Sequence, residues 1–220
     1  MGELLVAQAI WLLGQDEQWM RPRAGTMPVV AAAAAVLDVI GSGAARWDEG
    51  GGGIAVDTGS VPAREGLLGC WTERLARAAA TGPLPVIHSV DAVSPDVWEL
   101  LGADLAAAGL TEDVPRALAR WRPPRRRPRP EPSRRVRTRL LDVVHGRREG
   151  TEWDEGVLAV ASCAGVLEHV LSGSAFTDTS VLVPVERYLS RSDLVPRLEP
   201  ALSYLTSIGP VLGSHGEGAS

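Results

Sequence analysis

The chain has 220 residues, of which 45% are hydrophobic and 22% charged, and its formal net charge is −5. This composition is close to the globular average, and it excludes a disordered, collagen-like or membrane-spanning chain. All 22 basic residues are arginine, and the absence of lysine excludes Schiff-base chemistry and a Walker A phosphate site. The two cysteines, Cys70 and Cys163, are too few for a disulfide scaffold or a four-thiolate zinc site.

The N-terminal part of the chain predicts two helices and a hairpin. Apolar residues recur at helical spacing over residues 4–13. A second, alanine-rich helix is expected to begin at the N-cap Thr26 and to end near Gly41, because threonine favours helix starts and glycine adopts the left-handed end conformation. The segments Ala45–Asp48 and Ile54–Asp57 flank a run of glycines, which is typical of a β-hairpin.

Helices dominate the middle of the chain as well. A third helix is predicted through residues 67–76, after which Pro83 and Pro85 break the chain. A fourth helix is expected over Val97–Ala108, since a serine and a proline precede it and a glycine follows it. A fifth helix is expected over Ser133–Val144, after an extended stretch rich in proline and arginine.

The C-terminal third predicts a core helix and a helical tail. The core helix covers Glu155–Leu171, which is apolar on nearly every face. Shorter helices are expected around Val185–Ser190 and Leu198–Ile208, and residues 213–220 are expected to be disordered. We therefore expect a mainly α protein, with a single compact helical domain over residues 1–212 and one or two short β-hairpins.

Positive charge is concentrated in one segment. Residues 116–148 hold 13 arginines against two carboxylates, Glu131 and Asp142, so this segment carries +11 and the rest of the chain −16. A dense positive field attracts polyanions, and the planar guanidinium group binds phosphate through paired hydrogen bonds. The candidate contacts with an anionic surface are Arg122, Arg125, Arg126, Arg127, Arg129, Arg134 and Arg135.

Two interpretations of this basic segment stay open. In the first, the arginines pair with the protein's own carboxylates, and each exposed pair stabilises the fold only slightly. In the second, they bind anionic phospholipid, including phosphoinositide head groups, or an acidic protein. Nucleic acid is disfavoured as a partner, because only Trp121 accompanies the basic run and no nucleic-acid-binding module is recognisable.

The sequence contains no recognisable catalytic or metal-binding motif. The histidines have no ligand spacing, and Cys163 has apolar neighbours, which favours an inert thiol over a nucleophile. We therefore predict no catalytic residue, no metal and no cofactor, and a hydrolase is a disfavoured alternative. Trp19, with Arg21 and Arg23 beside it, is a candidate site for a phosphorylated head group, and a lid over the core is the alternative role of this tryptophan.

Four stretches of the chain follow one another in a recognisable order. Ala34–Gly41 is similar to the helix end L-x-E-L-A-L-x-G, and Val97–Leu110 to the helix V-R-E-R-L-x-x-x-L-x-x-x-G-V-L. The other two are Glu3–Asp16 and the basic segment with the helices Arg134–Val144 and Val157–Leu171 that follow it. Together the four stretches resemble the Golgi phosphoprotein 3 family.

The resemblance implies a mostly helical domain with a non-enzymatic, peripheral membrane role. Members of the family bind phosphatidylinositol 4-phosphate in a basic pocket that contains a tryptophan. Trp19 lies at about the position of that tryptophan, and Arg21 or Arg23 would supply an arginine. Trp98 and Leu100 stand where the family has the two arginines of its V-R-E-R-L helix, which removes two phosphate donors.

The resemblance also implies an apolar hairpin that enters the bilayer. It corresponds to residues 111–121, where Leu118 and Trp121 are the candidate membrane-tip residues. The segment Arg122–Arg139 would add less specific binding to anionic lipid. We expect a cytoplasmic protein on the inner face of a membrane, and the alternative is a soluble scaffold with a decayed lipid pocket that binds an acidic protein.

Overall fold

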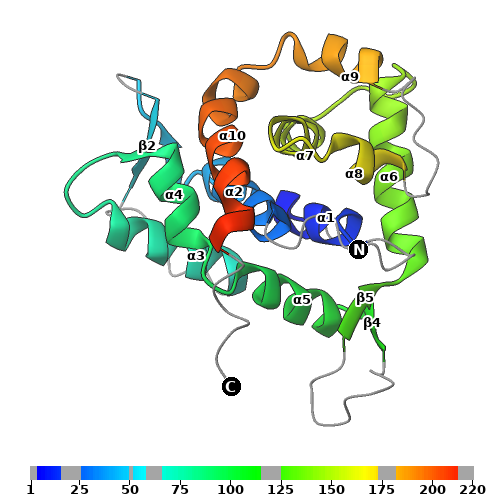
Figure 1. Ribbon diagram of the computed structural model, residues 1–220, viewed down its shortest axis with the longest axis horizontal. Coiled ribbons are helices and arrows are strands. Elements are labelled where there is room, and N and C mark those ends of the chain that lie inside the picture. The colour runs from blue at the N-terminus through cyan, green and yellow to red at the C-terminus, as the bar shows by residue number, and fades with distance from the viewer. Residues whose placement is uncertain are drawn as a thin grey trace.

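Figure 1 shows the fold of the protein in a computed structural model. The structure describes residues 4–15, 26–49, 52–57, 66–114, 125–172 and 182–212. These residues form ten helices and two small antiparallel sheets. The expected fold class, mainly α with short hairpins, is therefore confirmed. The disorder predicted for residues 213–220 lies outside the described residues.

The helices and the strands are each numbered in their order along the chain. The helices are α1 (Val6–Leu13), α2 (Thr26–Gly41), α3 (Gly66–Ala78), α4 (Val86–Val93), α5 (Val97–Ala107), α6 (Pro130–Val144), α7 (Glu152–Cys163), α8 (Leu167–Ser172), α9 (Leu182–Leu189) and α10 (Leu194–Leu212). The strands are β1 (Ala45–Trp47), β2 (Gly53–Val56), β3 (Leu84–Pro85), β4 (Thr111–Val114) and β5 (Arg125–Pro128).

Helix α2 forms the centre of the core. Its alanine run, Ala31–Ala35, has no solvent exposure, and the short side chains let neighbouring helices approach closely. Helices α1, α4, α7 and α10 all contact α2, as Figure 1 shows from one side. The predicted start differs slightly, because Thr26 is itself the first residue of α2 rather than the residue before it.

A buried carboxylate joins α1 to α2. Asp38 of α2 is 9% exposed, and its two oxygens accept hydrogen bonds from the backbone N–H groups of Val6 and Ala7, at 2.8 and 2.9 Å. These N–H groups lie in the first turn of α1 and have no acceptor within that helix, so Asp38 caps α1 from another helix. Burial raises the pKa of Asp38 to about 7, although the two N–H donors act in the opposite direction.

The predicted hairpin after α2 is confirmed and has a third strand. Strands β1 and β2 pair antiparallel, with Ala45 opposite Val56, and β3 pairs with β2 on its other side. Gly53 lies where β2 meets β3, and a Cβ there would lie 2.9 Å from the backbone oxygen of Leu84. A residue without a side chain is therefore required for this close approach.

Helices α4 and α6 differ from the prediction. Helix α4 is absent from the prediction, because Pro83 and Pro85 predict only a break in the chain. Pro85 instead stands immediately before the helix with extended backbone, and α4 buries Val86, Val90 and Val93 at helical spacing. The helix predicted over Ser133–Val144 begins earlier than expected, because α6 starts at Pro130. A proline is well tolerated in the first turn of a helix, so it does not prevent this start.

The predicted core helix over residues 155–171 is wrong as a single helix. The chain forms α7 and α8 instead, and the two are separated at Gly165, which has a φ of +66°. Such a left-handed residue ends a helix, and glycine adopts it without a Cβ clash. Helix α7 keeps the expected burial, with residues 156–161 all in the core.

Candidate anionic-surface binding site

The β4–β5 hairpin holds arginines directly opposite acidic residues. Glu112 pairs in register with Arg127, and Asp113 with Arg126. Nε of Arg127 donates to the carboxylate of Glu112. Nε of Arg126 lies 3.8 Å from Oδ1 of the Asp113 carboxylate. The four side chains are between 39% and 63% exposed, so each ion pair stabilises the hairpin by at most about 1 kcal/mol. The segment expected to be an extended stretch therefore contains a strand that pairs with β4.

Helix α6 continues this surface directly from β5. Val136 and Leu140 are buried against the core, which turns Arg134 and Arg135 outward to solvent. We define the arginine surface as the exposed arginines of β5, of the residue that follows it and of the first half of α6. They are Arg126, Arg127, Arg129, Arg134 and Arg135.

The described residues neutralise the arginine surface only in part. Arg135 forms an ion pair with Glu131, one helical turn earlier. Arg129 and Arg134 form no ion pair with any residue that the structure describes. Among the residues that the structure describes, the carboxylates of Glu112, Asp113 and Glu131 form ion pairs with arginines of this surface, and all three carboxylates are in contact with solvent.

The second half of α6 directs its arginines into the molecule instead. Nε of Arg137 donates to the backbone oxygen of Val170 in α8, at 3.2 Å. The guanidinium group of Arg139 binds the carboxylate of Asp154 with two parallel bonds, Nε to Oδ1 at 2.6 Å and one terminal nitrogen to Oδ2 at 2.9 Å. The same group lies over the ring of Trp153, with 4.3 Å between its central carbon and the ring centroid.

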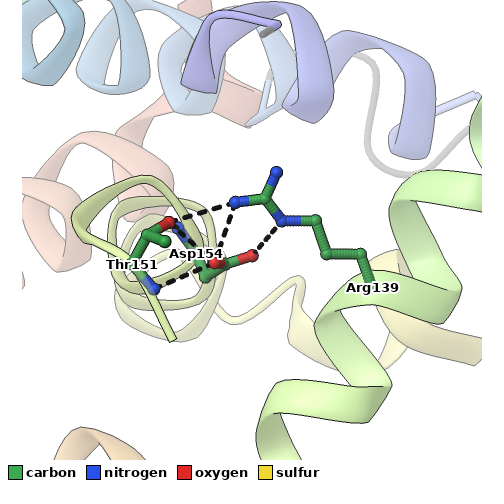
Figure 2. A network of polar contacts seen from close by, with 3 residues as sticks. All are labelled: Arg139, Thr151 and Asp154. Carbon is green, nitrogen blue, oxygen red and sulfur yellow. Dashed lines mark hydrogen bonds and ion pairs between the residues drawn. The ribbon is translucent and has the colours of Figure 1, made fainter. Parts of the chain in front are cut away.

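Figure 2 shows that Arg139 reaches from α6 to the first turn of α7. Thr151 and Asp154 cap that turn reciprocally: the Thr151 hydroxyl and N–H donate to Asp154 at 2.7 and 3.0 Å, and the Asp154 N–H donates to the hydroxyl at 3.4 Å. Asp154 has no solvent exposure. Burial alone would raise its pKa, but the hydrogen bonds from Arg139 and Thr151 outweigh burial and hold the pKa below the usual value. Arg139 is therefore a structural residue.

Several predicted site residues lie outside the described residues. They are Trp19, Arg21, Arg23, Leu118, Trp121 and Arg122. The backbone of Arg125 begins β5 opposite Val114. Within the part of the chain that the structure describes, no helix is both long and apolar enough to cross a membrane.

Trp98 has a packing role. Its ring lies 5.6 Å from that of Trp11, with 34° between the two planes. Trp11 Nε1 donates to the backbone oxygen of Trp98 at 3.0 Å, so this side of α5 is fixed against α1. Leu100 is half-buried. Neither side chain can bind phosphate through charge-assisted hydrogen bonds.

Metal ligands and a reactive thiol are the two catalytic features that the sequence brings into question. No group of three or more histidine, cysteine or acidic side chains among them is placed to hold a metal ion. Burial and the charge of Glu199 raise the pKa of the Cys163 thiol to about 11, and its Sγ lies 3.8 Å from the backbone oxygen of Val195. A thiol with such a pKa is almost fully protonated at neutral pH and is a poor nucleophile.

Sequence reasoning missed the acidic partners of the basic segment. Glu112 and Asp113 precede Arg126 and Arg127 by more than a dozen residues, and only the strand pairing brings them together. The signal in the sequence is the order of charges, two acidic residues followed by basic ones, which suits an antiparallel pair. Asp154 carries no such signal, because its pairing with Arg139 depends on how α6 and α7 pack.

A scan against models of protein families finds none that matches the chain. A search of curated proteins finds no match either.

Proposed function

We propose that the protein is a non-enzymatic module that binds anionic phospholipid on the inner face of a membrane through the arginine surface. The observation that carries this proposal is the exposure of five arginines along one continuous piece of chain, from β5 into α6. Near an anionic membrane each such residue contributes about 1 kcal/mol of attraction. Among the described residues, guanidinium groups outnumber carboxylates on this surface, which makes it positive, whereas the chain as a whole is acidic.

The ion pairs within the arginine surface do not prevent lipid binding. A guanidinium group has five N–H donors. Arg126 and Arg127 approach their carboxylates through Nε, and their terminal nitrogens form no hydrogen bond with any other described residue. These terminal groups can bind a lipid phosphate while the ion pair persists, or the exposed pair can exchange its carboxylate for a phosphate at little cost.

Vesicle co-sedimentation tests the proposal. The protein is mixed with vesicles of phosphatidylcholine alone, or with added phosphatidylserine or phosphatidylinositol 4-phosphate at equal surface charge. We expect binding only to the anionic vesicles, and weaker binding as salt screens the charges. Equal binding to neutral vesicles, or none to anionic vesicles at low salt, contradicts the proposal. Tighter binding to phosphatidylinositol 4-phosphate at equal charge would indicate a defined head-group site in addition.

Paired variants locate the binding surface. The variant Arg126→Gln/Arg127→Gln loses about 2 kcal/mol of attraction, so its partition to anionic vesicles falls roughly thirtyfold. The control Arg147→Gln/Arg148→Gln removes the same charge beyond the end of α6 and is expected to bind nearly as the wild type. Equal loss in both variants would show that only total charge matters and would refute the assigned surface.

Removing the opposing carboxylates gives the reverse effect. In Glu112→Gln/Asp113→Asn the arginines lose their internal partners, so binding to anionic vesicles should increase. The alternative function, a scaffold for an acidic protein, has its own readout. Binding to poly-glutamate that depends on Arg126 and Arg127, without any vesicle binding, would favour that scaffold over the lipid-binding module.

A further inference from the structure

A cavity of about 430 Å³ opens where the end of α6, the start of α7 and helix α9 meet. Its volume lies in the range of roughly 300–1,000 Å³ that is typical of small-molecule sites. No residue of the arginine surface lines it. The lining residues are Val143, Val144, Gly146, Glu155, Pro184, Arg187, Tyr188, Arg191 and Ser192.

One wall of the cavity is apolar and held in place. It consists of Val143, Val144, Pro184 and the ring of Tyr188. A Cβ at Gly150 would collide with the Tyr188 hydroxyl and would lie 3.0 Å from a methyl group of Val143. The tyrosine therefore lies across the backbone of Gly150, against the end of α6, and only glycine permits this position. The wall suits a short hydrocarbon chain.

The polar groups of the cavity are mostly hydrogen-bond donors that have no partner among the described residues. Arg187 lies in the last turn of α9 and Arg191 just beyond it, both are exposed, and neither forms an ion pair with any described residue. The Tyr188 hydroxyl has no hydrogen-bond partner among the described residues either. Burial and the charges of Glu155 and Asp154 raise the pKa of Tyr188, so the hydroxyl stays protonated and can donate.

Glu155 limits the charge that the cavity accepts. One of its carboxylate oxygens accepts a hydrogen bond from the Ser192 hydroxyl. The oxygen of this hydroxyl in turn accepts a hydrogen bond from the N–H of Leu194, at the start of α10, at 3.1 Å. This chain of bonds fixes the carboxylate on the cavity wall. A dianion such as a phosphate monoester would be repelled there, whereas a single negative charge is offset by the two arginines.

We infer that this cavity, between α6, α7 and α9, binds a small organic carboxylate. The carboxylate group accepts hydrogen bonds from Arg187, Arg191 and the Tyr188 hydroxyl, and its hydrocarbon part covers Val143, Val144 and Pro184. This site is independent of the arginine surface and of the proposed binding to lipid.

Isothermal titration calorimetry with four probes tests the inference. The full-length protein is titrated with hexanoate, hexanol, hexylamine and inorganic phosphate. We expect saturable binding of hexanoate at a single site, and at least about tenfold weaker binding of the other three, since hexanol and hexylamine lack the negative charge and phosphate lacks the hydrocarbon part. Hexanoate that produces no saturable heat overturns the inference. Hexanol or phosphate that binds as tightly as hexanoate overturns the carboxylate assignment.

Variants of the cavity separate this site from other cationic surfaces. Arg187→Gln and Arg191→Gln should each weaken hexanoate binding about tenfold, and Tyr188→Phe about fivefold. The control Arg77→Gln removes an exposed arginine of α3, which lies far from α9 in Figure 1, and should leave the affinity unchanged. Circular dichroism verifies that each variant is folded. Unchanged affinity in Arg187→Gln/Arg191→Gln overturns the assigned site.

Discussion

The arginines of α6 offer a direct test of the difference between a buried and an exposed ion pair. Arg139 is 21% exposed and binds a carboxylate with no exposure, that of Asp154. Replacing Arg139 by alanine leaves this carboxylate buried without its cation, which costs about 3–5 kcal/mol of unfolding free energy. Arg135, on the same helix, pairs with Glu131 at the surface, and Arg135→Ala should cost about 0.5 kcal/mol or less.

Urea unfolding followed by circular dichroism measures both variants at neutral pH. Because the bonds from Arg139 lower the pKa of Asp154, the stabilisation is present above the unfolded pKa of 3.8 and is lost as the pH falls through the folded value. The deficit of Arg139→Ala against the wild type should therefore shrink in acid. In Arg139→Met/Asp154→Leu, where neither charge remains, most of the stability should return. Equal, small losses in Arg139→Ala and Arg135→Ala, independent of pH, would refute this reasoning.

Three further predictions concern the core. The pKa of Asp38 is about 7 in the folded state and 3.8 in the unfolded chain, so the folded state holds the proton of Asp38 more tightly. Between these pH values the wild type should therefore lose up to about 1.4 kcal/mol of unfolding free energy per pH unit relative to Asp38→Asn. Urea unfolding at several pH values checks this, and a wild type that gains stability relative to the variant as the pH rises would show that the two N–H donors outweigh burial. With a pKa of about 11, Cys163 should react with iodoacetamide at pH 8 far more slowly in the folded protein than in urea, as peptide mass spectrometry would show; equal rates would place the thiol in a reactive environment. A Cβ at Gly102 would lie 3.1 Å from the ring of Trp11, so Gly102→Leu should lower the unfolding free energy by about 1–3 kcal/mol in calorimetry, and an unchanged Tm would mean that the ring can move aside.

The elements with a strong local pattern could be predicted from the sequence. Helix α2 has an apolar run with a terminal glycine, and the β1–β2 hairpin has a glycine turn between two short strands. Helix α4 has only eight residues and follows two prolines. The helical spacing of its three buried valines is the only sign of this helix in the sequence. The division of α7 from α8 depends on the conformation of Gly165, because the apolar pattern continues through it.

The candidate site shows a different limit. The excess of arginine could be found by counting residues, but counting does not tell which side chains face solvent. Arg134 and Arg139 occur in the same basic run and have opposite roles, since one is exposed and the other binds buried Asp154. The difference comes from the helical phase of α6 and from its contacts with α7 and α8. Strand β5 likewise could be predicted only together with its partner β4, and residues 115–124 separate the two strands in the sequence.

Because β5 leads straight into α6, and α6 is anchored through Arg139, the positively charged stretch is not a detachable tail. Truncating residues 122–139, the usual way to ask what a basic region contributes, would also remove buried Val136 and the cation that keeps the first turn of α7 in place. A mutant of that kind would report misfolding, whichever ligand it was tested with. Only substitutions that change charge while preserving the helix can separate the two roles of this stretch.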